Sequence, residues 1–571
     1  MQTATRKEIS RIVRSENGAM SKAYGDVRVA LVYPNTYRLA MSNLGFQTVY
    51  ALINQNPLSQ CERSVLLDFP EAVTLESGST LSSFDVVAFS VSFELDYPNI
   101  VEILRRAKIP PRSADRQPYH PLIVAGGAAA MLNPEPIADF VDLFVVGEAE
   151  TVLDDLLCTI AESKGKDKAL VKESASQLPG VYVPSLYGVE LDEAGRLLAV
   201  TRASTAGVSP ASFHQTAQSS GVRGQGLEVR GVHAEKPGSG TGFQPVNHGQ
   251  DAHATSAPSW FIPPGAPYPV RRNPPPDIGK FDTMTQVLTP DTVFGQRLLI
   301  EVSRGCPGRC KFCAVRAIYS PTRWRTAESI LRALRQQFHR EKRVGLLGAA
   351  VGDHPELEQI CSALAEDGAD TSISSVRPGK LSPALVRALA RGNVQTLTIA
   401  PEAGSERIRG EIGKPLSDKQ LLDSARLVKD SGIPSLKTYF IVGLPGEKQE
   451  DVEEIVARVF ELSSIIHVKV SVSPFVPKPR TPYQRLPMQS LDYLRTTLAY
   501  LQKQLRKLKG VAFTAASPRQ SHLEAALSRG SRDLSLWIEQ GFPSPRVVEE
   551  RACREIPDGE LLPWSIIPDA P

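Results

Sequence analysis

The sequence predicts an α/β protein in which an N-terminal doubly wound parallel sheet precedes a partial (β/α)6 barrel and a helical C-terminal region. Three observations lead to this prediction. Short apolar stretches alternate with helix-like stretches over residues 1–165, and six further strand–helix units follow within residues 281–488. A stripe of leucines at helical spacing then begins at Leu491. Strands that are separated by helical connections are typical of parallel sheets.

Short apolar stretches define the predicted N-terminal sheet. The expected elements are strands at residues 27–33, 86–91, 122–125 and 143–146 and helices at residues 45–54 and 150–161. Ligands of such sheets bind beyond the carboxyl ends of the strands. The residues there are small or polar, namely Asn35, Ser90, Ser92, Gly126, Gly127, Gly147 and Glu148. Glycines let the backbone approach a large flat ligand closely, although tight turns alone would also account for them.

The composition of the segment between the two predicted sheets changes twice. Residues 180–200 predict a β-hairpin that turns at residues 192–195. Residues 203–258 are rich in Gly, Ser, Ala, Gln and Thr, which is typical of a disordered insertion, and a proline-rich connector follows. His248 and His253 could indicate a metal site in this insertion, but we favour a flexible polar loop.

Three of the seven cysteines, Cys306, Cys310 and Cys313, lie within an eight-residue window. A chance match to this spacing is roughly a one-in-a-thousand event, so the cluster needs a chemical reason. Three thiols cannot all pair as disulfides, and no fourth Cys or His follows nearby to complete a structural zinc site. Three soft thiolates on a tight loop can instead hold three irons of a cubane cluster. Zinc and an electron-relay cluster remain the alternatives.

The position of these cysteines favours an active site. The apolar residues 298–302 predict a buried strand that leads directly into the cysteine loop. The loop therefore lies at the carboxyl end of a strand, where barrel enzymes build their active sites. A 4Fe-4S cluster that is held by three protein thiolates keeps one iron open for a substrate or cofactor.

The CxxxCxxC spacing, with Phe312 before the last cysteine, resembles the signature of the radical S-adenosylmethionine (SAM) superfamily. The resemblance implies a TIM-type partial barrel in which SAM chelates the open iron. One electron from the cluster then cleaves the sulfonium to a 5'-deoxyadenosyl radical, and a flavodoxin or ferredoxin supplies that electron. The cofactors carry this chemistry, while the protein positions them and excludes water.

The predicted barrel strands provide candidate SAM contacts. The strands that follow the cysteines are expected at residues 344–351, 371–376, 395–400, 436–442 and 467–473. The residues near their carboxyl ends that are expected to contact SAM are Gly348, Gly352, Arg377, Glu402 and Gly443, together with Phe312. Glu402 could accept hydrogen bonds from the ribose or the ammonium group, or it could be a helix N-terminal carboxylate. Arg316, Arg323 and Arg325 could contact an anionic group or form an ordinary basic helix entrance.

The N-terminal pattern resembles the cobalamin-binding domain that precedes many radical SAM barrels. Domains that ligate cobalt carry Asp-x-His-x-x-Gly after the first strand, whereas this chain has PNTYRL at residues 34–39. The resemblance therefore implies either a corrin without a protein ligand or a domain that has lost the cofactor. The motifs SISSVRP, IAPEAGSER, FIVGLPGE and SPFVPKPRTPYQ resemble an uncharacterised group of cobalamin-type radical SAM proteins.

A weaker resemblance links the chain to tRNA methylthiotransferases. The second set of cluster-binding cysteines in those enzymes is absent here, because Cys61 and Cys158 are widely spaced. We expect these two, Cys361 and Cys553 to be small buried hydrophobic residues.

Composition limits the compartment and the partners. The chain has 571 residues, of which 42% are hydrophobic and 22% charged, and its net charge of +3 is too small to predict nucleic-acid binding. No apolar run approaches the roughly 20 residues of a membrane span, and we expect a cytoplasmic protein. Four basic residues, Lys503, Arg506, Lys507 and Lys509, lie off the leucine stripe and predict a solvated face or an RNA contact.

The expected domains are a cobalamin-binding-like domain (1–165), a hairpin connector (166–202), an insertion with a linker (203–280), the radical SAM barrel (281–488) and a C-terminal extension (489–571). The expected function is reductive SAM cleavage, with cobalamin, to methylate or otherwise modify an unreactive carbon of an unknown substrate. The alternative is a non-catalytic iron-sulfur protein that relays electrons, senses iron or oxygen, or binds RNA. No individual catalytic residue is predicted.

Overall fold

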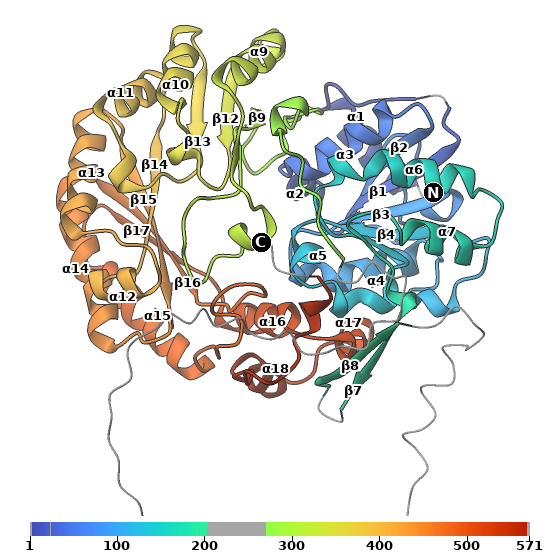
Figure 1. Cartoon of the computed structure of the whole chain (residues 1–571). Helices are drawn as coiled ribbons and strands as arrows, with labels where there is room; N and C mark the ends of the chain where they lie inside the picture. The colour runs from blue at the N-terminus through green and yellow to red at the C-terminus, as the bar shows by residue number, and fades with distance from the viewer. Residues whose placement is uncertain (1–2, 23, 193–194, 203–269, 568–571) are drawn as a thin grey trace, which may run out of the picture.

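The computed structural model describes residues 3–22, 24–192, 195–202 and 270–567. The predicted insertion at residues 203–258, with His248 and His253, lies outside the described residues. In Figure 1 the N-terminal domain lies beside the barrel domain, and the C-terminal helices α16 (Pro518–Ser528) and α17 (Ser535–Gln540) pass beneath both. Among the described residues, no helix combines the length and the apolar composition that a bilayer span requires.

The N-terminal domain contains the predicted doubly wound sheet. Its strand order is β2-β1-β3-β4-β5-β6, and all pairs are parallel except β5 with β6. The strands are β1 (Val27–Tyr33), β2 (Ser59–Val65), β3 (Val86–Ser90), β4 (Leu122–Gly126), β5 (Leu143–Val145) and β6 (Val181–Tyr182). The order reverses between β1 and β3, which is where ligands of such sheets bind.

Strand β2 was not predicted, because its sequence SQCERSV is polar. The strand is nevertheless largely buried. Arg63 forms ion pairs at 2.7 Å with both Glu16 and Glu76, and these pairs compensate the buried charge. A long-range ion-pair network therefore replaces the apolar pattern from which strands are predicted.

Helices cover both faces of this sheet. Helices α1 (Thr3–Arg14), α3 (Leu44–Gln55) and α6 (Leu153–Glu162) pack on one face, and α4 (Tyr97–Arg106) packs on the other. Alternating residues of β1 point to the two faces, with Leu31 in one core and Val32 in the other. Helix α17 packs on the α4 face, so the end of the chain completes the first domain.

The barrel domain is an open, parallel arrangement of two sheets. The orders are β13-β12-β9 and β14-β15-β16-β17, and a parallel bridge between Val376 and Ile399 joins the two sheets. The strands are β9 (Leu298–Glu301), β12 (Arg343–Leu347), β13 (Asp370–Ile373), β14 (Thr396–Glu402), β15 (Ser435–Val442), β16 (His467–Pro474) and β17 (Val511–Ala515). The six predicted strands are confirmed. The C-terminal region is mainly helical, as predicted, and it also contributes one strand, because β17 pairs in parallel with β16.

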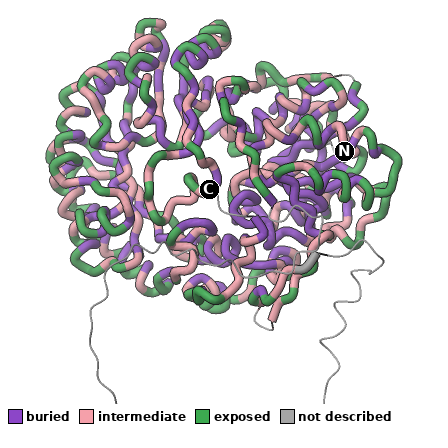
Figure 2. Tube along the Cα trace, viewed as in Figure 1, coloured by how far each residue is buried: buried purple, intermediate pink, exposed green. Residues whose placement is uncertain are grey.

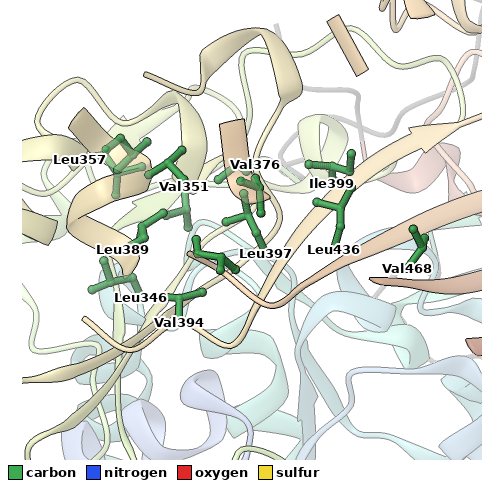
Figure 3. Packing of buried hydrophobic residues seen from close by; sticks show 14 of the residues in the cluster. Leu346, Val351, Leu357, Val376, Leu389, Val394, Leu397, Ile399, Leu436 and Val468 are labelled. Atoms are coloured by element: carbon green, nitrogen blue, oxygen red, sulfur yellow. The ribbon is translucent and has the colours of Figure 1, made fainter. Parts of the chain in front are cut away.

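Helices surround the barrel on its outer side. They are α9 (Ala327–Gln337), α10 (Leu357–Glu366), α11 (Pro383–Arg391), α13 (Asp418–Asp430), α14 (Gln449–Ile465) and α15 (Leu491–Leu505). Figure 3 shows strand residues such as Leu346, Leu397 and Leu436 packed in one apolar core. The leucine stripe is confirmed within α15, but Leu508 lies beyond the end of the helix and is half-buried. Figure 2 shows the buried segments continuing from both domains into the C-terminal helices.

The predicted hairpin is also present. Strands β7 (Tyr187–Leu191) and β8 (Leu197–Arg202) are antiparallel, and the Gly195 N–H donates to the Asp192 carbonyl at 2.9 Å. Arg532 of the C-terminal region binds Glu135 and the Tyr182 hydroxyl at 2.8 and 2.7 Å. These contacts fasten the C-terminal region to the first domain.

Candidate functional site

A cavity of about 520 Å³ lies between the carboxyl ends of the N-terminal strands and the first strands of the barrel. Six of the predicted corrin contacts line it, namely Ser90, Ser92, Gly126, Gly127, Gly147 and Glu148. Asn35 does not line the cavity, since its amide turns away and donates to Asp96 at 2.6 Å. The topology therefore collects residues from three separate loops at one opening.

The cavity continues as an apolar slot between the sheet and two helices. The residues that line the slot are Val29, Leu31, Val86, Ala88 and Val124 of the strands, Thr48, Val49 and Ile53 of α3, and Leu156, Leu157 and Ile160 of α6. The buried Thr48 hydroxyl has no hydrogen-bond partner within the described residues. Because an unpaired buried hydroxyl is costly, this slot has a polar group available for a ligand.

The barrel contributes the other wall of the cavity through Glu301, Arg304, Tyr319, Leu347 and Gly348. Gly348, which was expected to contact SAM, therefore faces the interdomain space. A Cβ at this position would lie 2.3 Å from the Ser303 hydroxyl, so only glycine fits.

A buried ion-pair network closes the cavity between the two domains. Glu148 of the first domain binds Arg304 and Arg323 of the barrel domain, at 2.5 and 2.6 Å. Arg304 also binds Glu150 and Glu301, at 2.8 and 2.7 Å. Arg323 is thus committed to Glu148 rather than to an anionic ligand.

The other two arginines near Trp324, Arg316 and Arg325, have different surroundings from Arg323. Arg316 is exposed, and the buried Arg325 donates to Ser329 of α9 at 3.2 Å. Two guanidinium nitrogens of Arg325 are buried without a hydrogen-bond partner among the described residues.

The cysteine loop leaves β9 and is closed at its base by an antiparallel pair, β10 (Ser303–Arg304) with β11 (Arg323–Trp324). Cys306 Sγ accepts hydrogen bonds from the Gly308 N–H at 3.4 Å and from Arg377 at 3.5 Å. Arg377 is held in place by Asp353, at 3.0 Å. A Cβ at Gly308 would lie 3.0 Å from the Arg377 guanidinium, so a side chain here would push the guanidinium away from its present position.

The electrostatic surroundings of the thiols are mixed. Burial raises the pKa of the Cys310 thiol, and the Lys414 ammonium lowers it. Burial also raises the pKa of Cys313, to about 11. Metal coordination would therefore have to displace these protons, which soft iron or zinc ions can do.

The spacing of the three sulfurs can be compared with that of the ligands of a single metal ion. The three sulfurs are not all within 4.8 Å of one another. Zn–S bonds of about 2.3 Å place tetrahedral ligand sulfurs about 3.8 Å apart. In this arrangement the three sulfurs are therefore spread more widely than the ligands of a single zinc ion.

Glu402 and Lys414 form an ion pair at 2.8 Å beside the cysteines. Glu402 is the last residue of β14 and has a φ of 71°, a strained conformation for a residue other than glycine. It is not a helix N-terminal carboxylate, because α12 (Glu406–Glu411) begins after the Ser405 cap. Burial raises the pKa of Glu402, and Lys414 opposes that shift. Lys414 was not predicted, since no local pattern marks it.

The remaining predicted SAM contacts lie around this group. Phe312 packs with Leu444 and Phe475 at the ends of β15 and β16. The neighbouring Gly443 has a φ of 78°, and its N–H donates to Glu447 at 2.7 Å. Gly352 lies against Val376, the residue that precedes Arg377, and a Cβ at Gly352 would lie 2.9 Å from the Val376 side chain. Phe312, Arg377 and Glu402 are thus brought together at the cysteines, while Gly348 lies at the cavity.

The cysteine loop and the first domain are in direct contact. Ala314 and Ile318, which follow Cys313, pack with Ala128 and Met131 of α5 (Ala128–Leu132). Gly127, which lines the cavity, immediately precedes α5. The cysteine loop and the cavity therefore share a wall.

Of the four isolated cysteines, Cys61 and Cys361 are buried as predicted. Cys158 and Cys553 are half-buried, so the prediction is wrong for these two.

Comparisons with solved structures and with relatives place this geometry in context. A SAM radical methyltransferase from Kitasatospora setae is 13% identical, with a TM-score of 0.46 over 78% of this chain and 72% of that chain. An uncharacterised protein of Methanocaldococcus jannaschii is 26% identical over 517 residues, which cover 90% of both chains. A ribosomal protein uS12 methylthiotransferase of Syntrophobacter fumaroxidans is 30% identical over 210 residues, or 33% of this chain and 44% of that enzyme.

Two family models match the two domains separately. The model for radical SAM proteins, N-terminal, matches residues 45–184, and the radical SAM superfamily model matches residues 300–459. The second match contains the cysteine loop and strands β12 to β15. The chain therefore belongs to the radical SAM superfamily, as the spacing of its cysteines predicted.

Proposed function

We propose that the protein is an enzyme in which Cys306, Cys310 and Cys313 hold a 4Fe-4S cluster that binds and reductively cleaves SAM. The observation that carries this proposal is the loop of three thiols beside the strained Glu402 and the Arg377 guanidinium. When bound, the cluster supplies one electron from a flavodoxin- or ferredoxin-type reductant, which converts SAM to methionine and a 5'-deoxyadenosyl radical.

The residues around the thiols have distinct expected roles. Arg377 donates to Cys306 Sγ and offsets the negative charge of a thiolate. Glu402 is an acceptor for the SAM ammonium or ribose hydroxyls, and Lys414 orients its carboxylate and opposes the rise of its pKa. Phe312 and Leu444 form an apolar wall that excludes water from the reacting atoms.

We further propose that the interdomain cavity binds a corrin without a protein ligand to cobalt. The glycine-lined opening allows a flat macrocycle to approach, and the apolar slot with its one unpaired Thr48 hydroxyl suits the aromatic base of a nucleotide tail. The turn after β1 offers no histidine, and Asn35 there is bound to Asp96. Phe93 lines the cavity with 57% of its surface exposed, which provides an apolar contact instead. A bound corrin would carry a methyl group from SAM to the substrate.

The substrate is proposed to have an unreactive carbon that becomes methylated or otherwise modified after hydrogen abstraction. RNA is one candidate substrate, since Lys503, Arg506 and Lys507 form an exposed basic group at the end of α15. The reducing cytoplasm is the compartment that suits thiolate-bound iron.

Anaerobic purification followed by a SAM cleavage assay tests the proposal. We expect about four irons per chain, an iron-sulfur absorption band, and 5'-deoxyadenosine after reduction in the presence of SAM. Cys306→Ala should abolish all three signals, whereas the control Cys158→Ala should retain them. A cluster-loaded protein that yields no 5'-deoxyadenosine with any reductant would favour the electron-relay or sensing alternative. A corrin absorption band with a methylated product would support the corrin proposal, and turnover without corrin would refute it.

A further inference from the structure

A second set of metal-ligating side chains lies in the C-terminal region, apart from the cysteine loop. One ring nitrogen of His522, a carboxylate oxygen of Glu549 and Cys553 Sγ all lie within 4.8 Å of one another. His522 belongs to α16, while Glu549 lies on α18 (Pro545–Ala552) and Cys553 caps it. Within the part of the chain that the structure describes, no other group of His, Cys, Asp and Glu meets this distance.

The hydrogen bonding of His522 leaves one nitrogen without a partner. His522 is 1% exposed, and its Nε2 lies 2.9 Å from the Gln489 carbonyl. A carbonyl can only accept, so Nε2 carries the proton and Nδ1 presents a lone pair. Nδ1 is buried and has no hydrogen-bond partner among the described residues. Metal-ligating histidines commonly have this arrangement, in which the second ring nitrogen donates to a backbone carbonyl.

The other two side chains are also oriented by their neighbours. Glu549 and Cys553 are four residues apart, so one turn of α18 brings them to the same face. Glu549 Oε1 accepts the Leu491 N–H at 2.7 Å, which orients the carboxylate. Cys553 Sγ lies 3.6 Å from the same Gln489 carbonyl that His522 contacts. Three chain segments therefore converge on one point.

We propose that His522, Glu549 and Cys553 bind one zinc ion. Imidazole, carboxylate and thiolate are the ligand types of zinc, and thiolate and imidazole disfavour magnesium and calcium. A thiolate and a carboxylate together neutralise the charge of the ion. The fourth position of the tetrahedron is left for water, because Glu549 and Cys553 are only half-buried.

The position of this zinc site relates it to the barrel. Gln489 contacts the metal-ligating group on one side, and a Cβ at Gly443 would lie 3.2 Å from the Gln489 side chain on the other. The ion would thus hold the segment before α15 against α16 and α18, directly behind the Gly443 turn. The site does not depend on the cluster, so it stands even if the protein cleaves no SAM.

Metal analysis of the full chain tests the proposal. The cluster-loaded protein is compared with a variant in which Cys306, Cys310 and Cys313 are all alanine, so that zinc cannot bind at the cluster loop. We expect about one zinc ion per chain in both proteins. After replacement by Co²⁺ we expect a thiolate-to-cobalt charge-transfer band, and a higher melting temperature with zinc than with a chelator.

Two conservative variants and a matched control complete the experiment. Cys553→Ser should lose the charge-transfer band, and Glu549→Gln should lower zinc affinity at least tenfold, consistent with the loss of a ligand. Cys158→Ser, which changes a half-buried cysteine elsewhere, should bind zinc like the parent. Circular dichroism shows whether each variant is folded. A folded parent without zinc or a cobalt band, or an unchanged cobalt band in Cys553→Ser, would overturn the proposal.

Discussion

Glu148 of the N-terminal domain and Arg323 of the barrel domain form a bidentate ion pair, with N–O distances of 2.6 and 2.9 Å. Both side chains are buried. Arg304 binds the same carboxylate, so one acidic group holds two barrel arginines. The pair fixes the two domains on either side of the cavity, and the shape of the cavity therefore depends on it.

Removing the charge of Glu148 should destabilise the protein strongly. Glu148→Gln leaves Arg323 buried without a carboxylate, which costs about 3–5 kcal/mol of unfolding free energy. Chemical denaturation followed by fluorescence measures the loss, and limited proteolysis between the domains reports the opening. Glu328→Gln is the control, because its contact with Arg332 at 3.7 Å is exposed and should contribute nothing measurable. Equal stability of the two variants would show that the network does not hold the domains.

Two adjacent glycines should respond differently to a side chain. A Cβ at Gly126 would meet Val145 atoms at 3.4 and 3.7 Å, which are tolerable contacts. Gly126→Leu should therefore fold normally but fill the cavity, lowering hydroxocobalamin binding at least tenfold in a spectroscopic titration. Gly127 has a φ of 104°, and a Cβ there would lie 2.5 Å from the Val91 carbonyl. Gly127→Ala should lower stability by about 1–3 kcal/mol. Unchanged corrin binding in Gly126→Leu would contradict the proposed site.

Arg377 should tune the reduction potential of the cluster. Its guanidinium donates to Cys306 Sγ, and 38% of its side chain is exposed. Loss of this positive charge makes one-electron reduction of the cluster less favourable by about 1 kcal/mol, which lowers the reduction potential by roughly 40 mV. Arg377→Met should therefore have a more negative potential in a titration followed by electron paramagnetic resonance. The exposed Arg391, changed to Met, should leave the potential unaltered. A positive shift in Arg377→Met would be inconsistent with this role.

Glu447 should make stability depend on pH. Burial raises the pKa of Glu447 from 4.5 to about 7, although the Gly443 N–H and the Tyr493 hydroxyl partly oppose this. Between these values the folded protein binds a proton that the unfolded chain has released. The stabilisation by that proton is present below pH 4.5 and is lost as the pH rises through about 7.

The comparison of wild type with Glu447→Gln isolates this effect. Between pH 4.5 and about 7, the unfolding free energy of the wild type relative to that of the variant should fall by on the order of 3 kcal/mol. Cofactor-free protein is used throughout, so that acid lability of the cluster does not contribute. Parallel pH profiles for the two proteins would show that Glu447 does not titrate in this range.

Local patterns account for the elements that were predicted correctly. The apolar residues of β1 and β15 and the leucines of α15 follow the strand or helix period, which depends only on neighbours in the chain. Strands β2 and β17 lack such a pattern. The first is buried through the ion pairs of Arg63, and the second is a mostly exposed strand that pairs with β16.

The sequence by itself determined the cysteine spacing, the alternation of strands and helices, and hence the superfamily and the cluster loop. Tertiary structure alone decided that Arg323 binds Glu148, that Lys414 pairs with Glu402, and that His522 meets Cys553. The physical reason is that periodicity and motif spacing are properties of a short segment. Ion pairs and ligand groups instead require distant segments to pack, and their residues leave no regular trace along the chain.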